Sequence, residues 1–143
     1  MFNHKLRKKV YMLYLAGAFV VLVSGCASAP PTNEELANAD YGLPISQQEA
    51  EEKACIFLKR YLKDPDSAKI EWGTVQTGWI REAPILGGQL RFGYLLTANV
   101  NAKNSFGGYT GYKPYQFLFF NGSIVSVYAQ QELSGTPYMG KIY

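Results

Sequence analysis

The strongest candidates for chemistry in this 143-residue chain gather between residues 101 and 115. The segment reads NAKNSFGGYTGYKPY, and its candidate contact residues are Lys103, Asn104, Tyr109, Tyr112 and Lys113. Tyrosine and asparagine adapt well to polar partners such as glycans and peptides, and loops on a rigid scaffold often carry binding sites. This segment is therefore a candidate binding loop. The alternative is a long hairpin whose aromatic rings pack on their own sheet.

Acidic side chains offer a second kind of chemistry. Glu71 and Glu82 are expected on neighbouring strands, and retaining glycosidases use two carboxylates about 5 Å apart. The sequence pattern does not indicate that spacing. Asp64-Pro65-Asp66 is better explained as the end of a helix and a turn. A small carboxylate-based hydrolase acting on envelope glycans is the alternative to a binding protein.

Nucleophiles and metal ligands are scarce. The single histidine, His4, precedes residue 26, and the two cysteines are Cys26 and Cys55. A chain that begins at residue 26 lacks the imidazole needed for Ser–His–Asp or Cys–His catalysis and for histidine-containing zinc sites. Cys55 is expected to be a small buried residue rather than a reactive thiol. We predict a protein that is not an enzyme and that has no metal or cofactor.

The first 25 residues have the pattern of an export signal. Residues 1–9 carry four cations and no anion, and residues 10–23 are an apolar run of 14. That run has the length of a signal-peptide core and falls short of the roughly 20 residues that cross a bilayer. Small Ser24 and Gly25 then precede Cys26. The alternatives are an uncleaved membrane anchor and an ordinary signal followed by a chance cysteine.

The segment 22–26, LVSGC, resembles the lipobox of bacterial lipoproteins. The resemblance implies that Cys26 receives a diacylglyceryl group on its thiol and becomes the first residue of the mature chain. Two or three acyl chains hold a protein stably on a membrane, whereas one holds it weakly. Ala27 and Ser28 stand where inner-membrane lipoproteins typically carry aspartate. The resemblance thus implies the inner leaflet of the outer membrane, facing the periplasm.

Three further segments, 36–42, 61–69 and 100–112, resemble a family of small lipoproteins from Gram-negative bacteria. They read LANADYG, YLKDPDSAK and VNAKNSFGGYTGY. The family supplies no known catalytic residues, so no residue role is carried over from it.

Charge argues against nucleic acid as a partner. The formal net charge is +3, but four of the 14 basic residues precede residue 26 and none of the 11 acidic residues does. The mature chain therefore has ten basic and eleven acidic side chains, which leaves no cationic excess for a phosphate backbone.

The helix and strands that must position the loop are predicted from the sequence after residue 26. Residues 26–45 are rich in Pro, Ala, Asn and Gly and are predicted to be the lipidated cysteine and a flexible tether. A helix is predicted from Ser46, where Ser46 and Glu49 have capping-box spacing. Its apolar stripe is Ala50, Ala54, Phe57, Leu58, Tyr61 and Leu62.

The remainder reads as strands. Apolar alternation is clearest over 89–100, and Asn121-Gly122 fits a type I′ hairpin turn between strands 115–120 and 123–128. We predict an α+β domain over 46–143, with one amphipathic helix on a four- to five-stranded antiparallel sheet. Its predicted function is a non-enzymatic binding or assembly module of the cell envelope, with an envelope protein or glycan as partner.

Overall fold

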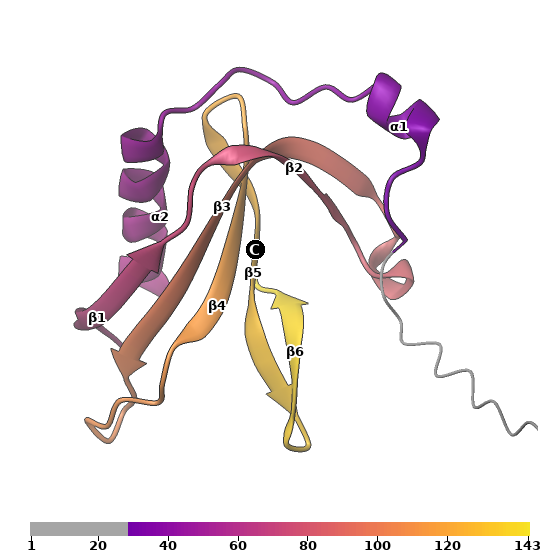
Figure 1. Cartoon of the computed structure of the whole chain (residues 1–143). Coiled ribbons are helices and arrows are strands. Elements are labelled where there is room, and N and C mark those ends of the chain that lie inside the picture. Colours follow the sequence, from indigo (N-terminus) through magenta and orange to yellow (C-terminus); the bar gives the residue numbers. More distant parts are fainter. Residues whose placement is uncertain (1–28) are drawn as a thin grey trace, which may run out of the picture.

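The computed structural model describes residues 29–143, so Cys26 and the predicted signal peptide lie outside the described residues. The elements are α1 (Asn33–Ala37), α2 (Gln47–Tyr61), β1 (Asp64–Trp72), β2 (Gln76–Arg81), the 3-10 turn η1 (Pro84–Leu86), β3 (Leu90–Lys103), β4 (Lys113–Phe120), β5 (Ser123–Leu133) and β6 (Thr136–Lys141) (Figure 1). Within 29–143, no helix is long and apolar enough to span a bilayer.

The six strands form one open antiparallel sheet in the order β1-β3-β4-β5-β6, and β2 also pairs with β3. This confirms the α+β class, with one main helix on an antiparallel sheet, but the strand number is six rather than four or five. The strand absent from the prediction is β6. Its side chains are mostly exposed, so the alternation that marks a half-buried strand is missing from its sequence.

Both β1 and β2 lie along the same edge of β3 and meet at a bulge. Trp72 faces Ala98 and Gln76 faces Leu95. The three residues 73–75 therefore lie opposite only two residues of β3, 96 and 97. The side-chain amide of Gln47, at the start of α2, donates to the Gly73 carbonyl at 2.9 Å. It also accepts from the backbone N–H of Val75 at 2.8 Å. The helix start therefore satisfies backbone groups that the bulge leaves unpaired.

One face of α2 packs on the sheet, as its apolar stripe predicts. Ala50, Ala54 and Leu58 are buried, and Ser46 caps the helix by accepting from the Glu49 N–H at 3.2 Å. The Glu49 carboxylate pairs with Lys53 at 2.8 Å. The buried core comprises Ile45, Ala50, Ala54, Leu58, Leu96, Ala98, Val100, Tyr115, Phe117, Phe119, Val127 and Ala129.

The β4–β5 hairpin has the predicted type I′ turn. Asn121 and Gly122 have φ of 49° and 72°, and both central residues of this turn need positive φ. Lys53 of α2 donates to the Gly122 carbonyl and so ties the helix to the hairpin.

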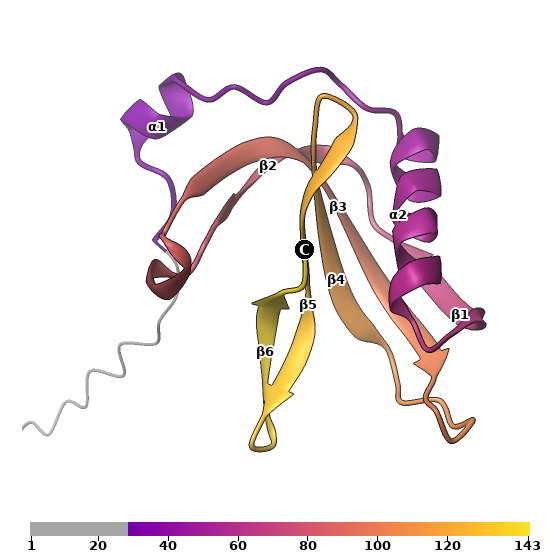
Figure 2. The ribbon, with the colours of Figure 1, turned by 180° about the vertical axis from the view of Figure 1, so that it is seen from behind.

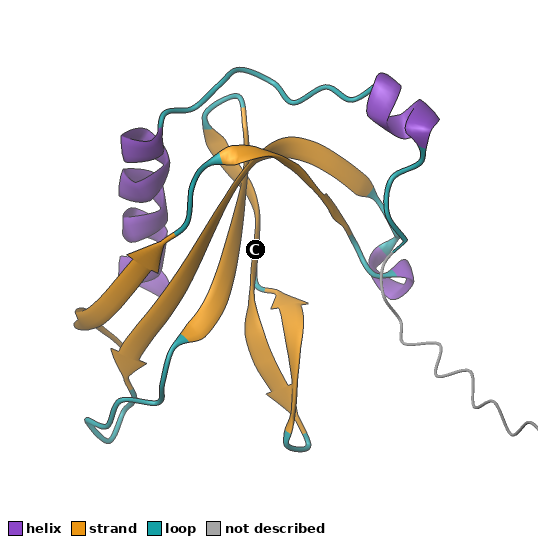
Figure 3. Cartoon of the chain, viewed as in Figure 1, coloured by secondary structure: helices purple, strands orange, loops and turns teal. Residues whose placement is uncertain are grey.

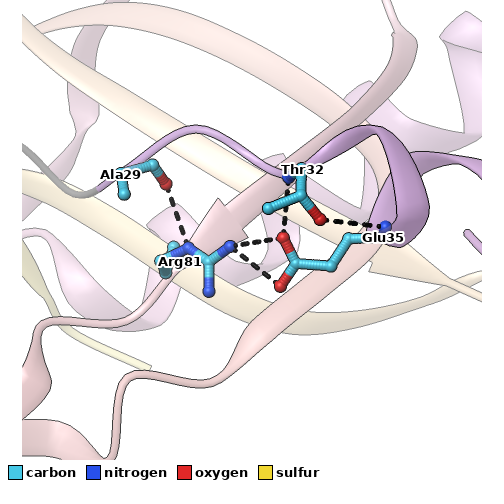
Figure 4. A network of polar contacts seen from close by, with 4 residues as sticks. All are labelled: Ala29, Thr32, Glu35 and Arg81. Carbon is cyan, nitrogen blue, oxygen red and sulfur yellow. Dashed lines mark hydrogen bonds and ion pairs between the residues drawn. The ribbon is translucent and has the colours of Figure 1, made fainter.

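The segment before α2 differs from the flexible tether expected over 26–45. Residues 32–37 begin with a reciprocal capping box between Thr32 and Glu35, which starts α1. The backbone N–H of Thr32 and the guanidinium of Arg81 both donate to the Glu35 carboxylate and lower its pKa. Arg81 reaches the Glu35 carboxylate at 2.9 Å and the Ala29 carbonyl at 3.0 Å (Figure 4).

Between α1 and α2 the chain runs over the end of the sheet that carries the β4–β5 turn (Figure 3). Leu43 N–H donates to the Asn121 side-chain oxygen at 2.8 Å, and the Tyr41 ring lies 5.5 Å from that of Phe92. Ile45 is buried in the core. These contacts join residues far apart in sequence, and composition alone does not reveal them. Residues 29–45 therefore pack on the domain rather than standing clear of it.

Candidate functional site

The predicted binding loop connects the long strand β3 to β4, at the end of the sheet away from α1 and η1 (Figures 1 and 2). Two strands of the central sheet hold its ends, since Lys103 closes β3 and Lys113 opens β4. The loop is thus anchored at both ends by paired strands.

Asn104 organises the loop from within. Its side-chain oxygen accepts from the N–H of Phe106 at 2.9 Å and from the N–H of Gly108 at 3.1 Å. Its own N–H donates to the Gly108 carbonyl at 2.9 Å. Gly107 has a φ of 78°, which glycine adopts without steric cost. Asn104 was predicted to contact a partner, but its oxygen is already engaged in positioning the turn.

Phe106 projects from this turn with 97% of its surface exposed. An unpacked aromatic ring on a turn with fixed backbone resembles the contact residues of rigid binding loops, which lose little entropy on binding. Phe106 was absent from the predicted contact residues. The sequence did offer a signal for Phe106, because this residue directly precedes two glycines and is therefore expected in a turn.

Tyr109 packs back onto the sheet. Its hydroxyl donates to the Ser67 carbonyl at 3.1 Å. The ammonium groups of Lys69 and Lys103 lie 4.8 and 5.6 Å from its ring centroid, at cation–π range. The packing alternative therefore describes Tyr109, although 44% of the residue is exposed.

The other two tyrosines of the segment differ from each other. Tyr112 is 47% exposed, whereas Tyr115 belongs to the core at 7%. Burial, with a smaller effect of Tyr61, raises the pKa of Tyr115 to about 12. Of the three, Tyr112 is the one left most available to a partner.

The loop forms one wall of a groove of about 480 Å³, beyond the carboxyl end of α2. The groove is lined by Tyr61, Leu62, Lys63, Val100, Ala102, Lys103, Asn104, Thr110, Lys113, Tyr115, Gln130, Gln131 and Glu132. Three lysines thus meet around it: Lys63, which follows the end of α2, Lys103 of β3 and Lys113 of β4. Side-chain amides on β5 lie beside them. Such donors suit a ligand rich in hydroxyl or anionic oxygens. The structure brings Lys103, Asn104 and Lys113 together here, while Tyr109 and Tyr112 are not part of the lining.

A stability measurement distinguishes the packed tyrosine of the loop, Tyr109, from the exposed one, Tyr112. We expect Tyr109→Phe, which removes the hydroxyl bonded to Ser67, to lower the free energy of unfolding by about 0.5–1.5 kcal/mol. We expect Tyr112→Ala to change it by less than about 0.5 kcal/mol, as for other exposed sites. Urea denaturation of both variants measures the difference. A larger loss for Tyr112→Ala would contradict the assignment of Tyr109 as the packed ring.

The carboxylates proposed for a hydrolase lie far apart. Glu71 faces Asn99 across β1 and β3, whereas Glu82 follows Arg81, which faces Leu90. Leu90 and Asn99 are nine positions apart along β3, which is roughly 30 Å of strand. No cluster of three or more potential metal ligands occurs among the described side chains.

Glu82 and Cys55 each have a structural explanation. Glu82 is 5% exposed and pairs with Lys141, with the Arg91 guanidinium 3.8 Å away. A buried carboxylate that is paired in this way is typical of a structural ion pair. Cys55 is half-buried, and burial raises the pKa of its thiol, which lowers the fraction of reactive thiolate.

Comparison with known proteins finds no counterpart. No protein-family model, no curated protein sequence and no solved structure matches the chain significantly. The resemblance to small Gram-negative lipoproteins therefore stays a prediction from the sequence.

Proposed function

We propose that this chain is a lipid-anchored, non-enzymatic binding or assembly module of the cell envelope. Lipid on Cys26 would hold it on the inner leaflet of the outer membrane, facing the periplasm. Residues 103–113 would contact an envelope protein or glycan. The leader pattern supports the location, and the geometry of the loop supports the binding role.

The exposure of Phe106 is the observation that carries the binding role. Folded proteins bury most of the surface of their large aromatic side chains. Tyr109, three positions after Phe106, does so through its hydrogen bond to Ser67. Asn104 instead holds the backbone so that Phe106 points outward. The fixed backbone makes this ring a suitable anchor for a partner.

The adjoining groove supplies the polar part of such a contact. Lys103 and Lys113 reach from the loop ends to the same hollow as Gln130 and Gln131. Interfaces commonly combine an aromatic anchor with a rim of hydrogen-bonding groups. The hydrolase alternative is less favoured, because Glu71 and Glu82 cannot act on one bond across this separation.

Replacing the exposed ring tests the proposal. We expect Phe106→Ser to leave the unfolding midpoint unchanged and to reduce cross-linked capture of envelope partners in intact cells about tenfold or more, the usual effect of losing an anchor residue. The matched control is Leu133→Ser, an apolar side chain that is 69% exposed at the β5–β6 turn. Quantitative mass spectrometry of material cross-linked to the full lipoprotein measures capture. Equal recovery from a stable Phe106→Ser variant would contradict the proposal.

A further inference from the structure

The tip of the β2–β3 hairpin is an uncharged, apolar turn. Residues 83–88 read APILGG, and Ile85 is 92% exposed while Leu86 is 53% exposed. Pro84 begins the short turn η1, and Gly87 ends it with a φ of 101°. This tight turn therefore presents two large aliphatic side chains side by side to solvent. Neither belongs to the core of the domain.

The described chain begins beside this hairpin. Arg81, the last residue of β2, donates to the Ala29 carbonyl at 3.0 Å and binds the Glu35 carboxylate through two hydrogen bonds (Figure 4). Ile85 lies four positions after Arg81, which is at most about 14 Å of chain. α1 and η1 also lie at the same end of the molecule in both views (Figures 1 and 2).

The position of Ala29 brings the expected lipid close to the same tip. Cys26 precedes Ala29 by three residues, which span at most about 11 Å. An acylated cysteine lies at the bilayer surface, so Ala29 can be no further from that surface than this short segment allows. The Arg81 contacts then hold the hairpin next to the anchor instead of at the end of a long free tether.

We propose that Ile85 and Leu86 insert into the interfacial region of the bilayer that holds the lipid of Cys26. This inference rests on the lipid anchor of the proposed function. An uncharged turn with exposed aliphatic side chains gains free energy by entering the acyl boundary. The anchor also keeps the bilayer at high effective concentration beside the tip, which no soluble partner matches.

Insertion would fix the orientation of the domain. The loop 103–113 lies at the other end of the sheet from η1, so it would face away from the membrane (Figures 1 and 2). Phe106 and the groove would then be presented to the periplasm rather than to the lipid.

A fluorescent probe at two almost fully exposed positions, 85 and 106, tests the inference. The full mature lipoprotein carries Cys55→Ser with either Ile85→Cys or Phe106→Cys, and the new thiol bears the environment-sensitive dye NBD. The protein is reconstituted in phosphatidylethanolamine–phosphatidylglycerol vesicles. We expect NBD at position 85 to shift to shorter wavelength, brighten severalfold and be quenched by brominated lipids. We expect NBD at position 106 to keep the spectrum it has in water.

Flotation of the same vesicles separates failure of this inference from failure of the anchor. Protein that floats but shows the same water-exposed spectrum at positions 85 and 106 would overturn membrane insertion and leave the anchor intact. Protein that does not float would overturn the anchor and the insertion together. Leu86→Cys serves as a second reporter of the tip, with the same direction of change expected.

Discussion

Leu58→Ala is expected to lower the free energy of unfolding by about 2–5 kcal/mol, the range for truncating a buried leucine. Leu58 is 2% exposed and lies in the core between α2 and the sheet. Its replacement removes buried apolar surface and leaves a cavity that the sheet cannot easily fill, because paired strands restrict backbone movement. Since single domains are stable by about 5–15 kcal/mol, this loss is a large share of the total.

Neighbouring residues provide the controls for this prediction. Phe57 is partly buried and its ring lies 5.9 Å from that of Phe117 and 5.8 Å from that of Tyr143, so Phe57→Ala is also expected to be strongly destabilising. Lys59 is exposed on the outer side of α2, and Lys59→Ala is expected to change stability by less than about 0.5 kcal/mol. Guanidinium denaturation at matched pH ranks the three variants. If Lys59→Ala lowered the free energy of unfolding more than the other two variants, α2 would have to present a different face to the sheet.

Local signals accounted for the parts of the fold that were predicted correctly. Ser46 marks the start of α2, and the spacing of Ala50, Ala54 and Leu58 marks its buried face. Asn121-Gly122 marks the hairpin because few other residue pairs adopt positive φ at both positions. Each of these signals lies within one element, so it can be read without knowing what the element packs against.

The elements that were missed depend on distant contacts or on weak patterns. Ser134 and Gly135 both have positive φ, as in the predicted hairpin, but Ser-Gly is a weaker marker than Asn-Gly. α1 is an exception, because its Thr32–Glu35 capping box is a local signal that the prediction of a tether over 26–45 overlooked. The docking of α1 was not readable, because it depends on Arg81, 46 positions beyond Glu35.

The candidate site was predicted as a segment but not residue by residue. The run of aromatic and polar residues identified the loop, whereas the roles within it follow from the pairing of β1 with β3. That pairing brings Ser67 within reach of the Tyr109 hydroxyl, whereas Phe106 is 97% exposed. The hollow shared by Lys63, Lys103 and Lys113 likewise depends on where α2 ends over the sheet.

Cys26→Ser has the second large expected effect, and it acts on location rather than on stability. The thiol of Cys26 is the predicted attachment point of the diacylglyceryl group, and a serine hydroxyl does not replace it there. Without the acyl chains, the contribution of about 0.8 kcal/mol per buried CH₂ is lost, and with it the stable hold on the membrane. Described residues 29–143 should fold as before, because the core they form is built from side chains between Ile45 and Ala129.

Labelling of growing cells with a clickable palmitate analogue measures lipid attachment at Cys26 most directly. Wild type and Cys26→Ser are compared at equal expression. Lipid attachment at Cys26 predicts a labelled wild-type band in the membrane fraction and an unlabelled variant that keeps its uncut signal. Equal labelling of the two proteins would contradict lipid attachment at Cys26, and with it the proposed location and the membrane contact of the β2–β3 hairpin.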